Sequence, residues 1–169
     1  MRRALIGLGI VILAGAACVL LISVLASRDS GSVATSSGPG TLEANRGSEE
    51  LTSDSPALPA SPPALPPTSG DHHPVSISKD RTELSDDQIL WALKLGNVVI
   101  AYEDIAPANL QQDPYTEQLA AAGQAVILDH RPGLGGIQAL AWRHRYKATG
   151  PSDPQLEDFI DAYLGQVSG

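Results

Sequence analysis

The sequence predicts a small α/β or α+β domain carried behind one transmembrane helix and a long polar linker. Three observations lead to this fold class. An uncharged apolar run occupies residues 4–26 of the 169-residue chain, and a stretch rich in Ser, Pro and Gly follows at residues 27–70. From Ser85 onward, amphipathic helical patterns alternate with short β-branched runs, which is typical of one modest domain of mixed secondary structure.

Residues 4–26 are predicted to be a transmembrane signal-anchor. These 23 residues form about 34 Å of helix, against a hydrocarbon core of about 30 Å. Arg2 and Arg3 precede the run, so the positive-inside rule places the N-terminus in the cytoplasm and the domain outside, as a single-pass protein of the cell membrane. Two alternatives stay open: cleavage after Ala26 as a signal peptide, and lipid attachment at Cys18.

Residues 27–70 are predicted to be a disordered linker, and residues 71–169 the folded, extracytoplasmic domain. The linker holds ten Ser, seven Pro and five Gly residues and no aromatic residue. Such a composition buries too little apolar surface to offset the entropy of ordering. A random coil of this length spans about 35–40 Å, which suits a spacer across the cell envelope. Its proline-rich second half could instead bind a proline-recognising module.

The first half of the domain has the pattern of a helix, a strand and further helix. The capping box Ser85-Asp86-Asp87-Gln88 predicts a helix that the next glycine ends. The β-branched run at residues 97–102 predicts a strand that is buried on both faces. Pro107 and Pro114 each suit a first helical position, so two short helices are expected between this strand and Gly123.

The second half is predicted to contain two strands and a final helix. Residues 124–129 form a buried-type strand, residues 130–136 a glycine-rich loop, and residues 137–143 a third strand. The last helix begins near Asp153. The strand–helix–strand crossover predicts a parallel pair, to which the third strand can add in antiparallel orientation. The same element order occurs in the second half of thioredoxin-like folds, an analogy of topology that implies no function.

The charge and cysteine content exclude several functions. The formal net charge is −8, and residues 71–169 carry 14 acidic against 7 basic residues. An acidic domain repels nucleic acid and anionic lipid surfaces, so neither is an expected partner. Cys18 is the only cysteine and lies in the apolar run. The domain therefore has no disulfide, zinc ribbon or thiol redox motif.

Four blocks of the chain, in the right order, resemble the bacterial family DUF3105, whose members often follow one membrane helix and a Pro/Ser linker. Each block alone is short, but the ordered set extends over roughly residues 66–164. The resemblance implies an uncharacterised domain of the cell envelope. The blocks are PPTSGDHHP (66–74), LWALKLGNVVIAY (90–102), GQAVILDHRPGLGGIQALAWRHR (123–145) and FIDAYLG (159–165).

The resemblance also implies a histidine cluster that this chain has largely lost. The family helix usually carries His, Glu and His before its glycine, and the His of the Thr-Ser-Gly motif would complete a metal or acid/base cluster. The matching positions here are Trp91, Lys94 and Leu95. His72 remains, and His73 replaces the usual Tyr.

The candidate metal ligands are His72, His73, Asp129 and His130, which could bind zinc or copper. Such a site requires the segment with His72 to pack beside the end of the second strand. The alternative is structural, in which His72 fills a turn between linker and domain and His130 is an exposed loop residue. No catalytic and no cofactor-binding residue is assigned.

Two further motifs favour structure over chemistry. The loop at residues 131–136 contains GxGG but lacks the Lys and the following helix of a phosphate cradle. The basic cluster is either a solvated strand end or a patch for an anionic partner; it comprises Arg143, His144, Arg145 and Lys147.

The favoured hypothesis is a noncatalytic, extracytoplasmic interaction module that meets an envelope protein. The alternative is an envelope enzyme or metal-handling protein with a degenerate histidine site. Trp91 and Trp142 are expected to be core aromatics.

Overall fold

The computed structural model describes residues 38–57, 59–107, 110 and 114–167, which belong to one compact unit, Gly38–Gly169. None of the helices in this described part has both the length and the apolar character needed to cross a bilayer. The predicted signal-anchor at residues 4–26 lies outside the described residues.

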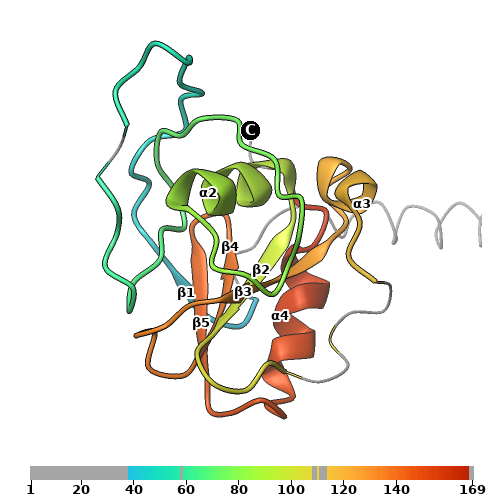
Figure 1. Cartoon of the computed structure of the whole chain (residues 1–169). Coiled ribbons are helices and arrows are strands. Elements are labelled where there is room, and N and C mark those ends of the chain that lie inside the picture. The colour runs from blue at the N-terminus through green and yellow to red at the C-terminus, as the bar shows by residue number, and fades with distance from the viewer. Residues whose placement is uncertain (1–37, 58, 108–109, 111–113, 168–169) are drawn as a thin grey trace, which may run out of the picture. The chain divides into compact units, whose positions relative to one another are not determined.

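The described chain forms a small α+β domain with a five-stranded mixed sheet and three helices (Figure 1). The helices and strands are β1 (Thr41–Leu42), α2 (Asp86–Leu95), β2 (Val98–Tyr102), α3 (Glu117–Ala121), β3 (Val126–His130), β4 (Ile137–Ala141), β5 (His144–Ala148) and α4 (Gln155–Tyr163).

The strands lie in the order β1-β5-β4-β2-β3. β2 and β3 are parallel, from Val98 opposite Val126 to Tyr102 opposite His130, and α3 lies in the crossover between them. β4 is antiparallel. The predicted parallel pair and the antiparallel third strand are thus confirmed. β4 is the central strand and pairs with β2 and β5, not with β3, the strand that precedes it in the chain.

One detail of the predicted element order is wrong. The third strand ends at Ala141, and a separate strand, β5, follows after a two-residue turn. The turn residue Arg143 has a φ of 62°, whereas tight hairpins usually place Asn or Gly at such positions. The sequence at this turn therefore gave no signal of the hairpin. Of the two helices expected between residues 103 and 123, α3 is present, and the one expected from Pro107 falls mostly on residues outside the described part of the chain.

Residues 38–57, here called the strap, pack against the domain although the sequence predicts a disordered linker there. Thr41 and Leu42 form β1 and pair with β5 at one edge of the sheet (Figure 1). Further along, Leu51 donates its backbone N–H to the His72 carbonyl at 2.8 Å, and the His72 N–H reaches Glu49 at 3.0 Å. These contacts are backbone hydrogen bonds. Apolar composition does not predict such backbone contacts.

Helices cover both faces of the sheet. Alternate residues of β2 point to opposite sides, so Val99 joins the core under α2 while Val98 and Ile100 join the core under α4. Ile89 and Leu93 of α2 and Ile127 of β3 complete the first cluster. The second cluster is centred on Leu156 and Phe159 of α4. This three-layer packing fixes α2 and α3 side by side on one face.

Candidate functional site

A single buried amide sets the spacing between α2 and α3. Asn97 follows the C-terminal glycine of α2, and its Nδ2 donates to the carbonyls of Ala92 at 2.9 Å and Ala120 at 2.8 Å. Its Oδ1 accepts the backbone N–H of Ala125 at 2.9 Å. Three of its four possible hydrogen bonds are therefore made inside the protein. Asn97 joins both helices to the start of β3.

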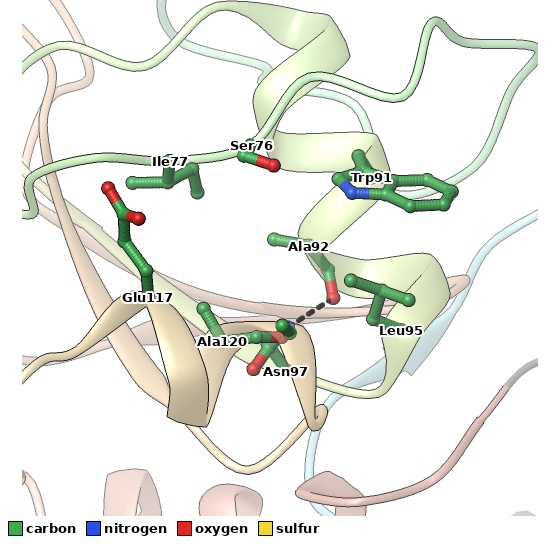
Figure 2. Close-up of a pocket in the computed structure, with 9 residues that line it drawn as sticks. Ser76, Ile77, Trp91, Ala92, Leu95, Asn97, Glu117 and Ala120 are labelled. Atoms are coloured by element: carbon green, nitrogen blue, oxygen red, sulfur yellow. Dashed lines mark hydrogen bonds between the residues drawn. The ribbon is translucent and has the colours of Figure 1, made fainter.

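A pocket of about 300 Å³ opens beside this amide, between α2, α3 and the segment that precedes α2 (Figure 2). Small side chains leave the space open: Ala92 on α2, and Ala120 and Ala121 on α3. Ser76 and Ile77 form the third wall. The complete lining is Ser76, Ile77, Trp91, Ala92, Leu95, Asn97, Glu117, Ala120 and Ala121.

The wall at Ile77 is held in place by Tyr115, whose hydroxyl donates to the Ile77 carbonyl. Burial raises the pKa of the Tyr115 hydroxyl, and the nearby charges of Glu117 and Asp80 add to this effect. The tyrosine therefore stays neutral and keeps its proton for this bond. The third wall is fixed rather than a free loop.

Two chemically different side chains lie at opposite sides of the pocket. Figure 2 shows the Trp91 indole at one side and the Glu117 carboxylate at the other, with Ala92 and Ala120 between them. Glu117 is exposed, and its carboxylate makes no hydrogen bond or ion pair with a described residue. It is the one charged group of the lining. The pocket is thus apolar with a negative charge at its edge.

His72 is fully buried, contacts the Trp91 ring and is not part of the pocket lining. Its ring lies 5.9 Å from the Trp91 ring and 6.0 Å from the Trp142 ring, and Lys94 Nζ lies 5.4 Å from the Trp142 centroid. Nδ1 is 2.9 Å from the Gly70 carbonyl, which can only accept, so Nδ1 carries the proton. Nε2 is left as a buried acceptor with no partner among the described residues.

The other candidate metal ligands are engaged in structural contacts. His73 Nδ1 pairs with Asp87 Oδ2 at 3.1 Å, which ties its segment to the start of α2. Asp129 is fully buried and accepts from the Leu84 N–H and from Arg131 Nε, both at 2.9 Å. His130 is exposed.

The structure does not assemble the four predicted ligands into one site. Among the described residues, no group of three or more His, Cys, Asp or Glu side chains is placed to hold a metal ion. His72 faces two tryptophans, whereas Asp129 faces an arginine and a backbone amide.

The glycine-rich loop does bind an anion, but the anion belongs to the same chain. The Glu103 carboxylate accepts the N–H groups of Gly133 at 2.9 Å and Gly135 at 2.8 Å. These two bonds lower the pKa of Glu103. Positive φ angles of 82° and 75° at the two glycines aim both N–H groups at the carboxylate.

The basic cluster forms part of β5 and is largely consumed by contacts. Arg145 pairs with Glu43 at 2.6 Å, and Arg143 Nε donates to the Glu43 carbonyl at 3.3 Å. The His144 ring stacks on Tyr163 at 4.4 Å. These residues form part of β5, to which they attach the strap and the last helix, and they do not form a free basic patch.

Sequence reasoning missed the pocket because its walls come from three separate segments. Trp91 was expected in the core, yet it is only half-buried and lines the pocket. Glu117 carried no local motif beyond the start of a helix. The one available signal was the run of alanines around α3, which cannot fill the space opposite a neighbouring helix.

These features define a small α+β domain with a partly apolar pocket between two helices on one face of its sheet. The chain belongs to DUF3105, a family of proteins of unknown function, whose sequence model matches residues 61–169. The resemblance seen in the sequence is confirmed. No significant match was found among curated proteins or among solved structures. The strap precedes the matched residues, so β1 and Glu43 lie outside the family domain.

Proposed function

We propose that this chain is a single-pass protein of the cell membrane whose domain lies outside the cytoplasm and acts as a noncatalytic interaction module. The apolar run at residues 4–26 and the preceding Arg2 and Arg3 support the anchor and its orientation. The α2–α3 pocket is the observation that supports binding.

The chemistry of the pocket favours binding over catalysis. Nucleophilic and general acid–base catalysis usually need a nucleophile and a base within hydrogen-bond reach of each other. No His, Cys or Lys is among the described residues that line the pocket, and no hydrogen bond joins Ser76 to Glu117. Its volume of about 300 Å³ is at the lower end for small-molecule sites. This size suits one anchoring side chain of a partner.

A second candidate function is a metal-handling or enzymatic role, which the buried Nε2 of His72 favours. An unpaired buried acceptor is costly and often marks a functional group. One imidazole between two tryptophans supplies a single ligand, so an external donor would have to complete the site.

We also infer a thioredoxin-like topology from the order α2–β2–α3–β3–β4–β5–α4 and the antiparallel addition of β4 to β2. The topology would carry no thiol chemistry here, since the one cysteine of the chain, Cys18, precedes the domain.

The membrane orientation is tested with alkaline phosphatase fused after Gly169, because this reporter is active only outside the cytoplasm. High phosphatase activity is expected. Replacing Arg2 and Arg3 by Glu in the same fusion should reduce this activity. Activity of a cytoplasmic reporter at the same position would contradict the orientation.

The interaction is tested in cells with a photo-crosslinking amino acid at Ala121, an exposed residue at the pocket. A discrete adduct is expected, and Ser76→Trp, which fills the mouth from another wall, should abolish it. The same crosslinker at Asp161 on α4 is the control. An identical adduct pattern from both positions, or an adduct that survives Ser76→Trp, would argue against docking in the pocket.

A further inference from the structure

We infer that the α2–α3 pocket receives a basic side chain of the partner, and specifically an arginine. This inference rests on the proposed function and names the chemistry of the group that the pocket binds. The nearest alternatives, a purely apolar or an acidic anchor, fit the same volume but not the charges.

The charge of the pocket is one-sided. Glu117 contributes a carboxylate with no ion-pair partner among the described residues, and no basic side chain is in the lining. The basic residue nearest along α2, Lys94, lies over Trp142 instead. The surrounding domain is acidic as well, with 14 acidic against 7 basic residues over positions 71–169. The local and the global fields both attract a cation and repel an anion.

The arrangement of the walls matches the parts of an arginine side chain. Its methylene stem can lie along Ala92, Ala120 and Leu95, which offer apolar surface. Its planar guanidinium can then present two N–H groups to the Glu117 carboxylate, and the Trp91 indole at the other side of the pocket offers a π-face to the same cation. Lysine supplies the charge but neither the plane nor the fork.

An apolar anchor is disfavoured because it would leave the Glu117 carboxylate desolvated and without a partner. A leucine in the pocket would remove water from Glu117 without replacing its hydrogen bonds, and a charge desolvated without a partner is costly. An acidic anchor would add repulsion between two carboxylates. Arginine is also among the residues that most often contribute large binding energies at protein interfaces.

The test uses the full chain in phosphatidylcholine nanodiscs and acetylated, amidated peptides Ala-Ala-X-Ala-Ala, with X as arginine, citrulline, lysine or leucine. Citrulline matches arginine in shape and lacks the charge. Binding is followed by tryptophan emission, because Trp91 lines the pocket. The arginine peptide is expected to bind about tenfold more tightly than the citrulline peptide. High salt should reduce this difference.

Three variants test whether the emission change comes from arginine binding in the pocket. Glu117→Gln should bring the arginine and citrulline peptides to equal affinity, whereas Glu157→Gln, an equal charge change on exposed α4, should leave the preference intact. Trp91→Phe should remove the emission response. A preference for leucine, or a charge preference that survives Glu117→Gln, would overturn the arginine inference and leave the pocket as a binding site. No response to any peptide, or one that persists in Trp91→Phe, would overturn the proposed function as well.

Discussion

Glu43 and Arg145 are 102 positions apart in the chain and form a two-contact ion pair, with Nε–Oε1 at 2.6 Å and Nη2–Oε2 at 3.2 Å. Arg145 also donates to the Pro66 carbonyl and to Gln138 Oε1, each at 2.6 Å. Burial disfavours the charge on Glu43, but the hydrogen bonds from Arg145 and Thr68 outweigh it and lower the pKa of Glu43. The strap is thus attached to β5 by charge as well as by β1.

Glu43→Gln is expected to loosen the strap and to lower the free energy of unfolding by about 1–2 kcal/mol, because Arg145 loses its charged partner. Chemical denaturation measures the stability, and limited proteolysis measures release of the strap. Glu49→Gln is the matched control, since Glu49 is exposed and its side chain makes no hydrogen bond or ion pair with a described residue. Equal proteolysis rates in the two variants would show that the ion pair does not hold the strap.

Asp153 should give the domain an acid-sensitive last helix. Its carboxylate accepts the Thr149 N–H at 2.8 Å, the Tyr146 hydroxyl at 2.8 Å and the Gln155 N–H at 3.0 Å. The Thr149 backbone bond and the Tyr146 bond are the main reasons that the pKa of Asp153 falls from 3.8 to about 2.

Because the folded pKa of Asp153 is below the unfolded value, its contribution to stability is present above pH 3.8 and is lost as the pH falls toward about 2. Asp153→Asn should therefore flatten the pH dependence of thermal unfolding in that window. Asp161→Asn, on the same helix and exposed, should leave it unchanged. If thermal stability in Asp153→Asn still falls with decreasing pH as in the unsubstituted chain, Asp153 is not the source of the acid sensitivity.

Asn97→Ala is expected to destabilise the domain by about 2–4 kcal/mol, because it leaves the carbonyls of Ala92 and Ala120 and the N–H of Ala125 without their partner. Denaturant unfolding measures the loss. Asn45→Ala removes one exposed bond, to Gly47, and should cost less than about 0.5 kcal/mol. Similar values for the two variants would show that Asn97 does not connect α2 and α3 as described.

The two adjacent histidines should behave differently. His72→Ala leaves a cavity between two tryptophans and should cost about 3 kcal/mol, whereas His73→Ala removes one half-buried contact with Asp87 and should cost about 1 kcal/mol or less. Thermal unfolding with and without added zinc measures both effects, and zinc is expected to give no stabilisation. A zinc-dependent rise in melting temperature that His72→Ala abolishes would favour the metal-handling candidate.

The sequence predicted best those elements that local patterns specify. The Ser85–Gln88 capping box is present in the structure with both of its hydrogen bonds, and α2 ends at Gly96 with a φ of 103°. Both buried-type strands, β2 and β3, pair as expected. Turn signals and β-branched runs are short-range features, so one sequence suffices to interpret them.

The sequence predicted least well the features that depend on contacts between residues far apart in the chain. The strap depends on Glu43 meeting Arg145, and no composition argument contains that pairing. The pocket likewise forms because Trp91 of α2 and Glu117 of α3 line opposite sides of one space, and this depends on how the two helices pack on the sheet. His72 was a candidate from the sequence, but its surroundings of two aromatic rings follow from tertiary packing alone.

The most direct test of the central claim is a set of intermolecular nuclear Overhauser effects between the arginine peptide and the methyl groups of the full chain in nanodiscs. We expect contacts from the arginine methylene protons to the methyl groups of Ala92, Ala120 and Leu95, which line the pocket. These contacts should weaken in Glu117→Gln to the level seen with the citrulline peptide. Contacts confined to methyl groups elsewhere, such as Ala148 on β5, would contradict the account.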